Sequence, residues 1–312
     1  MRTTPVIVCA LLLTLLLTYR AGAAKPVPQI EHVVIVSVDG LRPDLMLRAD
    51  APHMRSLYQS GSFSFWARTT AMSVTLPSHV SMLTGVVPNR HAILWNGDLE
   101  TVQPVYPRVP TLFEMAKNSG YTTALAAGKT KFSFLNKPET IDHVALLDAK
   151  EDALVAEAAA EMIREHRPSV LFVHMPVVDM AGHRQGWGTA EQLAAVEQAD
   201  AALGVVLEAL REAELMHKTL IILTADHGGA GKTHGPDDPR SRTIPWIAAG
   251  PGIRENYDLT RLRELEINTE DTCATALAFL DITPKISLDG KPITQIVEER
   301  ELLSDAPSAP SP

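Results

Sequence analysis

The chain has 312 residues, of which 46% are hydrophobic and 21% are charged, and its formal net charge is −9. This composition is typical of a folded globular protein with a full core and excludes a disordered chain. An acidic chain without a basic run is poorly suited to binding nucleic-acid polymers. Two cysteines are too few for a disulfide scaffold or a four-cysteine zinc site.

Residues 1–24 have the pattern of a secretory signal peptide. Arg2 precedes an apolar run over 6–17 that is too short to span a membrane, and small residues over 21–24 fit a cleavage site. We therefore expect export to the periplasm or secretion, with no membrane span after cleavage. The remaining cysteine, Cys273, lies in an apolar helical stretch, where we expect a buried and unreactive thiol.

Short apolar runs of strand length alternate with helical patterns along the rest of the chain. Strands are predicted at 32–38, 62–68, 121–127, 170–174, 220–224 and 244–249. Helices are predicted at 111–119, 151–166, 189–215 and 271–280. This alternation predicts an α/β fold, a three-layer α/β/α sandwich around a mostly parallel central sheet. We expect one domain over 25–303 and a disordered tail over 304–312.

Acidic and histidine side chains follow three of the predicted strands. Asp39 comes directly after the first strand, Asp179 and His183 follow the fourth, and Asp226 and His227 follow the fifth. Ligands of open α/β sheets bind beyond the carboxyl ends of the strands, so we expect these groups to converge. One such acid is usually a turn or helix cap. Three together are costly to bury unless cations offset their charge.

These residue types indicate divalent metal ions. Histidine, aspartate and alcohol ligands suit zinc, with manganese or iron as alternatives. Asp179 and His183 are spaced i, i+4, so a single helical turn directs both side chains at one ion. His234 follows later in the chain and is the candidate to complete a second histidine pair. His174 lies within a strand, where we expect a core role or support of a ligand.

A second motif, Thr75-Leu76-Pro77-Ser78-His79, offers a nucleophile. Its proline suits the first turn of a helix, and a helix start presents free N–H groups and a positive dipole end to a phosphoryl oxygen. A metal-bound threonine hydroxyl can lose its proton and attack. Taken alone, Thr75 is expected to be a helix cap. Beside the predicted metal ligands, the catalytic role is favoured.

The ordered combination of these motifs resembles the alkaline phosphatase superfamily, and within it the type I phosphodiesterase/nucleotide pyrophosphatase family. The resemblance runs from about residue 32 to about residue 283. It implies an alkaline-phosphatase-like fold and a phosphothreonine formed on Thr75. It also implies two metal ions, one held by Asp39, Thr75, Asp226 and His227, and the other held by Asp179, His183 and His234.

The resemblance also implies how the phosphoryl group is held. The backbone N–H of Leu76 and the amide of Asn96 would bind a non-bridging oxygen. Asn96 follows the segment Pro88-Asn89-Arg90-His91-Ala92-Ile93, in which Ala92 departs from the family's usual glycine. We expect structural roles for His79 and His91, which match motif positions.

The substrate class is left open by Lys129 and Lys131, which stand in a Lys-x-Lys pattern. The resemblance extends to monoesterases and phosphonate hydrolases of the superfamily, which use basic residues in a similar pattern. Solvated surface lysines are an equal alternative. An apolar wall for the leaving group is a further possibility, with core packing expected for at least two of its candidates, Trp95, Phe132, Phe134 and Trp187.

The sequence therefore predicts an exported, metal-dependent phosphoric ester hydrolase of the phosphodiesterase/nucleotide pyrophosphatase type, with a small phosphate ester as its substrate. A phosphomonoesterase or phosphonate hydrolase of the same superfamily is the alternative reaction. A non-catalytic metal- or ligand-binding protein is the alternative from another class. The sequence does not indicate an oligomeric state.

Overall fold

The computed structural model describes residues 25–97 and 105–298, which surround an eight-stranded sheet. The predicted signal peptide at 1–24 and the predicted tail at 304–312 lie outside the described residues. The strand order across the sheet is β4-β3-β5-β1-β6-β7-β2-β8. The strands are β1 (His32–Val38), β2 (Gly61–Arg68), β3 (Thr123–Ala127), β4 (His143–Leu146), β5 (Val170–Met175), β6 (Thr219–Thr224), β7 (Thr243–Ala249) and β8 (Tyr257–Asp258).

Five neighbouring strands, from β4 to β6, run parallel to one another. Strand β7 is antiparallel to both β6 and β2, and β8 pairs in parallel with β2. Every residue of β1 is buried, as its continuous apolar run predicts for a central strand covered on both faces. Ser37 on β1 pairs with His174 on β5 and with Thr224 on β6, which sets the register near the carboxyl ends.

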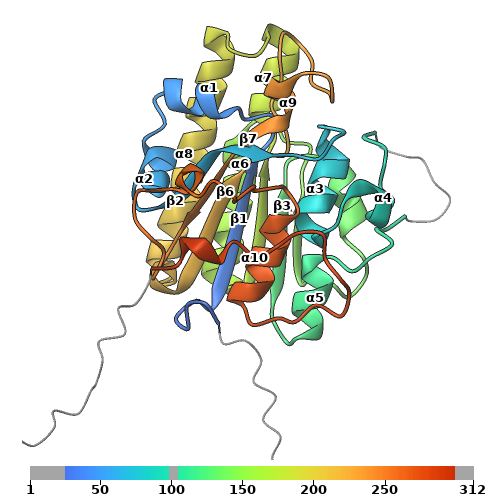
Figure 1. Ribbon diagram of the computed structural model, residues 1–312, viewed down its shortest axis with the longest axis vertical. Coiled ribbons are helices and arrows are strands. Elements are labelled where there is room, and N and C mark those ends of the chain that lie inside the picture. Colours follow the sequence, from blue (N-terminus) through green and yellow to red (C-terminus); the bar gives the residue numbers. More distant parts are fainter. Residues whose placement is uncertain (1–24, 98–104, 299–312) are drawn as a thin grey trace, which may run out of the picture.

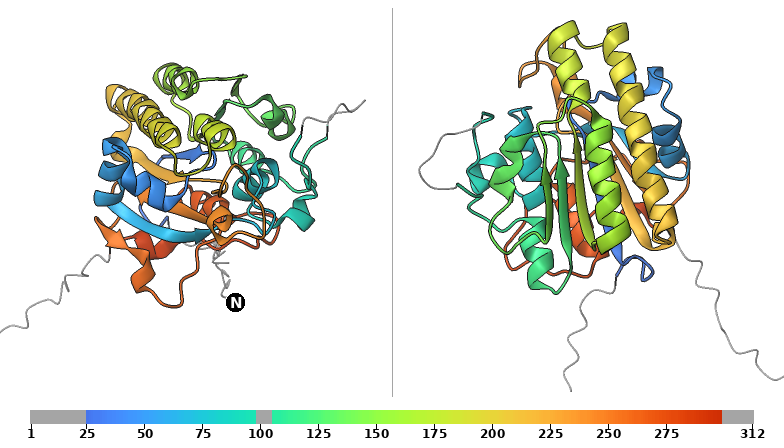
Figure 2. Two further views of the ribbon diagram at one scale, coloured as in Figure 1. Left: turned by 90° about the horizontal axis from the view of Figure 1, so that it is seen from above. Right: turned by 180° about the vertical axis from the view of Figure 1, so that it is seen from behind.

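Helices cover both faces of the sheet (Figures 1 and 2). The layer behind the sheet in Figure 1 is built around α8 and contains α1 (Pro43–Arg48), α2 (Pro52–Gln59), α6 (Asp152–His166), α7 (Val177–Gln185) and α8 (Ala190–Glu212). The opposite layer contains α3 (Thr75–Thr84), α4 (Pro88–His91), α5 (Leu112–Asn118) and α10 (Asp271–Phe279). Short helical pieces complete the chain: α9 (Pro239–Arg242), η1 (Thr130–Leu135), η2 (Met216–Lys218), η3 (Leu259–Arg261) and η4 (Thr294–Ile296).

This architecture confirms the predicted α/β fold with a mostly parallel central sheet. The sequence did not reveal that β7 runs against the other described strands of the sheet, because hydropathy marks a buried strand but carries no information on its direction. The helix predicted over 189–215 ends earlier, at Glu212. Glu214 has a φ of 56°, a left-handed conformation that an α-helix cannot continue through.

The helical layer behind the sheet is held by a buried carboxylate. Asp200 on α8 accepts hydrogen bonds from the backbone N–H groups of His53 (3.1 Å) and Met54 (2.7 Å) and from His53 Nδ1 (2.8 Å). It thereby caps the start of α2, which has no side-chain cap of its own. Cys273 is buried in α10, and burial raises the pKa of its thiol, as expected for an unreactive cysteine.

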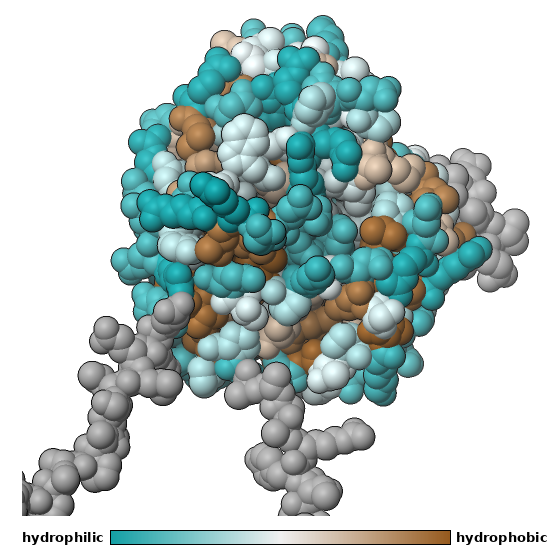
Figure 3. All heavy atoms as spheres, in the orientation of Figure 1, coloured by the Kyte–Doolittle hydropathy of each residue, from teal (hydrophilic) through white to brown (hydrophobic). Residues whose placement is uncertain are grey.

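The surface of the front face is mainly hydrophilic, with brown hydrophobic patches between teal areas (Figure 3). None of the helices in the ranges 25–97 and 105–298 is long and apolar enough to cross a bilayer.

Candidate metal centre and nucleophile

The three predicted acidic ligands meet at the carboxyl edge of the parallel strands. Asp39 directly follows β1, Asp226 lies two residues beyond β6, and Asp179 lies in the first turn of α7, which follows β5. All three carboxylates are buried. The backbone N–H of Gly40 donates to Asp226 Oδ1 at 3.1 Å and so links the ends of β1 and β6.

The predicted histidine ligands point their Nε2 atoms at this acidic cluster. His227 Nε2 lies 3.3 Å from Asp39 Oδ1, 3.3 Å from Asp226 Oδ2 and 4.0 Å from Asp179 Oδ1. His183 Nε2 and His234 Nε2 lie 3.3 Å and 3.9 Å from Asp179 Oδ1. There are thus two sets of three residues, and within each set the candidate ligand atoms all lie within 4.8 Å of one another. One is formed by Asp179, His183 and His234, and the other by Asp39, Asp179 and His227.

Backbone carbonyl groups fix the tautomer of each of these histidines. The Nδ1 atoms lie 2.8 Å from the Gly228 oxygen for His227, 3.0 Å from the Lys232 oxygen for His183, and 2.8 Å from the Ser73 oxygen for His234. A carbonyl oxygen only accepts, so each Nδ1 carries a proton, and Nε2 is the ring nitrogen that remains available to bind a metal ion. This is the arrangement that metal-ligating histidines adopt.

Within the cluster, three buried carboxylate oxygens have no hydrogen-bond partner among the described residues: Asp39 Oδ1, Asp179 Oδ1 and Asp226 Oδ2. These are the oxygens that face the histidine Nε2 atoms. Leaving a buried acceptor unsatisfied costs about 1–3 kcal/mol, and more when it is charged. The oxygen and nitrogen donors fit zinc or a similar divalent cation.

The electrostatics of the cluster show an excess of negative charge. Burial raises the pKa of Asp226, and the charges on Asp39 and Asp179 raise it further, well above its ordinary value. Burial also opposes ionisation of Asp39, but the Lys129 ammonium and the hydrogen bond from His174 hold its pKa well below the usual range. Divalent cations are the charge that would relieve the remaining repulsion.

Lys129 lies inside the cluster. Its Nζ lies 2.7 Å from Asp39 Oδ2 and 2.7 Å from Asp179 Oδ2, and its side chain is 19% exposed. Burial and the charge of Asp39 oppose ionisation of Asp179, yet His183 and Lys129 lower its pKa to about 2. The ammonium contacts only the Oδ2 atoms of the two acids. Their Oδ1 atoms, which have no hydrogen-bond partner among the described residues, face the histidine Nε2 atoms.

Lys131 lies beside Asn96, on the nucleophile's side of the cluster. Its Nζ donates to Asn96 Oδ1 at 3.0 Å and to the Asn96 carbonyl oxygen at 3.2 Å. The backbone N–H of Leu76 also donates to Asn96 Oδ1, at 2.8 Å. The structure thus brings together three of the four residues predicted to hold substrate, while Lys129 pairs with two predicted metal ligands. Neither Lys129 nor Lys131 is a solvated surface lysine.

Thr75 is the first residue of α3, with its Oγ1 3.4 Å from His227 Nε2. His79, one turn later, donates from Nδ1 to the Thr75 carbonyl oxygen (2.8 Å) and accepts at Nε2 from Ser37 Oγ (2.8 Å). His174 Nε2 donates to Asp39 Oδ2 at 2.9 Å. Both histidines are buried and hold the nucleophile segment and a predicted ligand in place.

Trp187 joins the three segments that carry the predicted ligands. Its Nε1–H donates to the Gly40 carbonyl oxygen at 2.9 Å. A Cβ on Gly182, between Asp179 and His183, would lie 2.6 Å from the Trp187 ring, and a Cβ on Gly229 would lie 2.3 Å from it. Only glycine therefore fits at these two positions.

Sequence reasoning placed Trp187 with Trp95, Phe132 and Phe134 as core or as a wall for the leaving group. Trp187, Phe132 and Phe134 are buried, and Trp95 packs edge-on against Phe134 with ring centroids 5.6 Å apart. The role of Trp187 was missed because its partners are far apart in sequence. The available signal was a glycine within each of the two ligand motifs.

The contacts of Trp187 predict that the Trp187→Phe variant binds zinc about tenfold more weakly than wild type, as is usual when a ligand's supporting shell is lost. Phenylalanine keeps part of the packing but cannot donate to Gly40. Trp246→Phe is the matched control, because Trp246 also donates from a buried Nε1, to Thr272 Oγ1, away from the ligands. Competition with a chromophoric chelator measures both affinities, and equal losses in the two variants would contradict the role of Trp187.

Asp152 secures the helix that carries Asp179 and His183. Its Oδ1 accepts from the backbone N–H of Val177, the first residue of α7, at 3.1 Å, while its buried Oδ2 has no partner among the described residues. Burial raises the pKa of Asp152 to about 7. The folded state therefore retains this proton at pH values where the unfolded chain has lost it.

This shift predicts a pH-dependent difference between wild type and the Asp152→Asn variant in the metal-free state. As the pH rises from about 4 to about 7, the unfolded wild-type chain binds fewer protons than the folded one, so wild-type stability falls. The introduced asparagine would still accept from Val177 but does not titrate. The variant should therefore gain stability relative to wild type up to pH 7 and level off above it. Urea unfolding across this range tests the claim, and a constant difference refutes it.

The chain matches the family model of type I phosphodiesterase/nucleotide pyrophosphatase over residues 33–238. A pyrophosphatase/phosphodiesterase of Schizosaccharomyces pombe, described as uncharacterised, is 24% identical over 218 residues, covering 64% of this chain and 44% of that protein. Ectonucleotide pyrophosphatase/phosphodiesterase family member 3 of Rattus norvegicus is 23% identical over 216 residues, covering 63% and 24%. The chain thus spans less than half the length of these relatives.

Solved structures share the fold. Murine ectonucleotide pyrophosphatase/phosphodiesterase 5 superposes with a TM-score of 0.73 at 13% identity, covering 86% of this chain and 100% of that one. A 2-O GAG sulfatase superposes with a TM-score of 0.69 at 16% identity, covering 86% and 74%. The likeness confirms the alkaline-phosphatase-like fold. Because the matched range 33–238 contains every predicted metal ligand, the chain belongs to the type I phosphodiesterase/nucleotide pyrophosphatase family.

Proposed function

We propose that this protein is an exported phosphoric ester hydrolase that cleaves small phosphodiesters through a phosphothreonine on Thr75. The convergence of unpartnered carboxylate oxygens and histidine Nε2 atoms beside the Thr75 hydroxyl carries this proposal. Every residue of the expected ligand set is present in the chain, which argues against a non-catalytic binding protein. The residues that would hold two divalent ions, zinc in the first instance, are Asp39, Thr75, Asp226 and His227 for one and Asp179, His183 and His234 for the other.

Bound divalent ions would supply positive charge for the attacking and leaving oxygens of an in-line displacement. Thr75 Oγ attacks phosphorus as its hydroxyl loses its proton, the bond to the leaving oxygen breaks, and that oxygen takes up a proton and departs as an alcohol. The phosphoryl group, which still carries its other ester, remains on the threonine. Water then cleaves the new ester and restores the hydroxyl. His79 holds the Thr75 carbonyl, so the nucleophile keeps its position at the start of α3 through both steps.

The start of α3 and Asn96 hold the phosphoryl group in this proposal. The helix presents the positive end of its dipole, and the Leu76 N–H is aimed at the same region as the Asn96 side chain. In the structure the Leu76 N–H donates to Asn96 Oδ1. A bound phosphoryl oxygen would therefore replace Asn96 Oδ1 as the acceptor of the Leu76 N–H.

Relatives support the substrate class and the location. Murine ectonucleotide pyrophosphatase/phosphodiesterase 5 has also been solved as an inactive variant in complex with AMP. Another relative, 25% identical over 214 residues, is a venom phosphodiesterase of Macrovipera lebetinus. We infer that this chain also takes a small phosphate ester and that residues 1–24 direct its export.

The nucleophile assignment predicts that Thr75→Ala lowers kcat/KM on bis-p-nitrophenyl phosphate at least about a thousandfold, because no other group can form the covalent ester. Metal content, measured by atomic absorption, should remain substantial, since six of the ligands stay. Thr84→Ala is the control, because Thr84 lies on the same helix and bonds only the Val80 carbonyl among the described residues. Removal of the metal with a chelator should abolish wild-type activity. Undiminished turnover by Thr75→Ala would contradict the assignment of Thr75 as the nucleophile.

A phosphomonoesterase is the second candidate, and the placement of Lys131 favours it. A monoester carries one more negative charge than a diester near neutral pH, and Lys131 Nζ stands beside Asn96, where the non-bridging oxygens are expected. Burial lowers the pKa of Lys131, and the neighbouring Lys129 lowers it further, so an added anionic oxygen would stabilise its charged form.

This placement predicts that Lys131→Ala reduces kcat/KM on p-nitrophenyl phosphate about tenfold more than on bis-p-nitrophenyl phosphate. Lys137→Ala serves as the control, because Lys137 is half exposed and pairs with Glu114 away from the site. The wild-type ratio of the two rates identifies the preferred class. An equal reduction of kcat/KM on both substrates would show that Lys131 does not interact with the additional negative charge of the monoester, and would favour the diesterase.

A further inference from the structure

A second groove opens at the same edge of the sheet, along the antiparallel strands β7 and β2. Its volume is about 630 Å³, and three arginines line it: Arg68 at the end of β2, Arg242 just before β7, and Arg263 beyond η3. Glu266 is the acidic side chain of its lining. The groove therefore carries a local excess of positive charge on a protein whose formal net charge is −9.

Arg242 has a polar group that nothing in the described chain satisfies. Its Nε is buried and without a hydrogen-bond partner, and no ion pair of its guanidinium is found among the described residues. The same arginine lines an adjoining cavity of about 310 Å³, together with Glu270. Glu270 forms no ion pair with Arg242 among the described residues. Arg242 as a whole is half-buried, and an anion beside its guanidinium would satisfy the shielded Nε–H.

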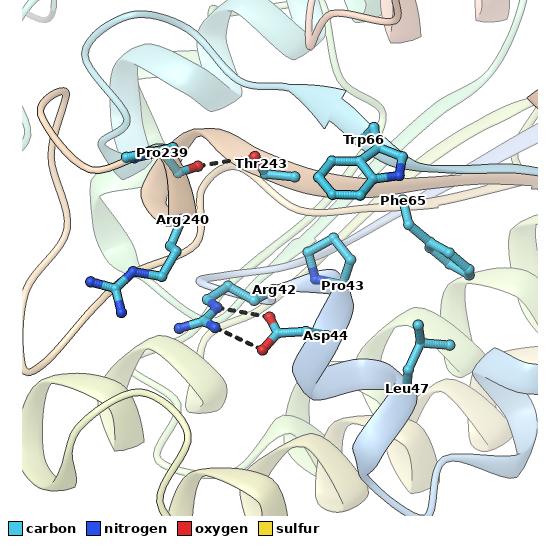
Figure 4. Close-up of a pocket in the computed structure, with 9 residues that line it drawn as sticks. All are labelled: Arg42, Pro43, Asp44, Leu47, Phe65, Trp66, Pro239, Arg240 and Thr243. Atoms are coloured by element: carbon cyan, nitrogen blue, oxygen red, sulfur yellow. Dashed lines mark hydrogen bonds and ion pairs between the residues drawn. The ribbon is translucent and has the colours of Figure 1, made fainter. Parts of the chain in front are cut away.

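The groove on the other side of Trp66 provides a comparison within the molecule. It holds about 440 Å³ and is drawn in Figure 4, where Trp66, Phe65, Pro43 and Leu47 form its apolar side. Both of its arginines are neutralised. Arg42 makes a two-point contact with Asp44 (2.9 and 2.7 Å), and Arg240 pairs with Asp238 at 2.8 Å. Arg242 and Arg263 have no such acid within the described residues.

Trp66 stands between the two grooves and lines both. Its side chain is 71% exposed, which is unusual for so large an apolar group. An aromatic face beside unpaired guanidinium groups is suited to a flat ligand that carries an anionic substituent. The leucines of the groove, Leu259, Leu262 and Leu265, add apolar surface for the body of such a ligand.

We propose that this groove is an anion-binding site for a phosphate, sulfate or carboxylate group attached to an aromatic body. Arg242 and Arg263 bind the anionic group, and the ring of the ligand lies against Trp66. The site is separate from the metal centre but connected to it. The Arg242 carbonyl accepts from the Thr69 N–H (3.0 Å), and Thr69 Oγ1 donates to the Asp226 carbonyl oxygen.

The test uses 2-naphthalenesulfonate, an aromatic anion that is not a phosphoric ester, in isothermal titration calorimetry with the whole protein. We expect Arg242→Gln and Arg263→Gln each to weaken its binding at least fivefold, and Trp66→Ala to weaken it similarly. Arg240→Gln is the matched control and should bind as wild type does, because that arginine is paired with Asp238. Thermal unfolding of each variant checks its fold, and Arg263 is exposed, so its substitution leaves the core intact.

A second arm separates this groove from the metal centre. Wild-type protein stripped of metal by a chelator should bind the sulfonate with unchanged affinity. Loss of binding on metal removal places the probe at the metal centre and overturns the proposal. Unchanged binding by both Arg242→Gln and Arg263→Gln, or no binding to wild type at millimolar concentration, overturns it as well.

Discussion

The charge of three buried carboxylates is the constraint around which this end of the protein is built. Asp39, Asp179 and Asp226 converge because three parallel strands end at one edge. Lys129 supplies a single positive charge through two short contacts. The histidines donate from Nδ1 to backbone carbonyls, so their Nε2 atoms are available on the side of the carboxylates. The remaining negative charge has no partner among the described residues, and divalent cations complete the proposed site.

The meeting of these ligands was predictable from the sequence, because continuous apolar runs mark where buried parallel strands end. The position of Lys129 was not. Lys129 follows β3, which lies two places from β1 in the sheet. Local sequence patterns do not predict the order of strands in a sheet. The roles of Trp187 and Asp152 were not predicted for a similar reason, since each acts through contacts with segments distant in the chain.

The reversal of β7 also decides what lies beside the candidate metal centre. Because β7 runs against β6, its first residues lie at the carboxyl edge of the parallel strands. Because β2 runs against β7, its last residues lie at that edge too. Arg242 and Arg68 are thus brought to the side of the sheet that holds Asp226. In a fully parallel sheet, the first residues of β7 would have lain at the edge opposite to the last residues of β2.

Trp187 and its two glycines couple three positions of this chain. The ring fills the space that a side chain at position 182 or 229 would need. An alanine at either position would therefore require a smaller side chain at position 187. A small residue at 187 would in turn leave a void between two segments that carry predicted metal ligands, unless one of the glycines gained a side chain. The side chain that one of these positions tolerates thus depends on the side chains at the other two.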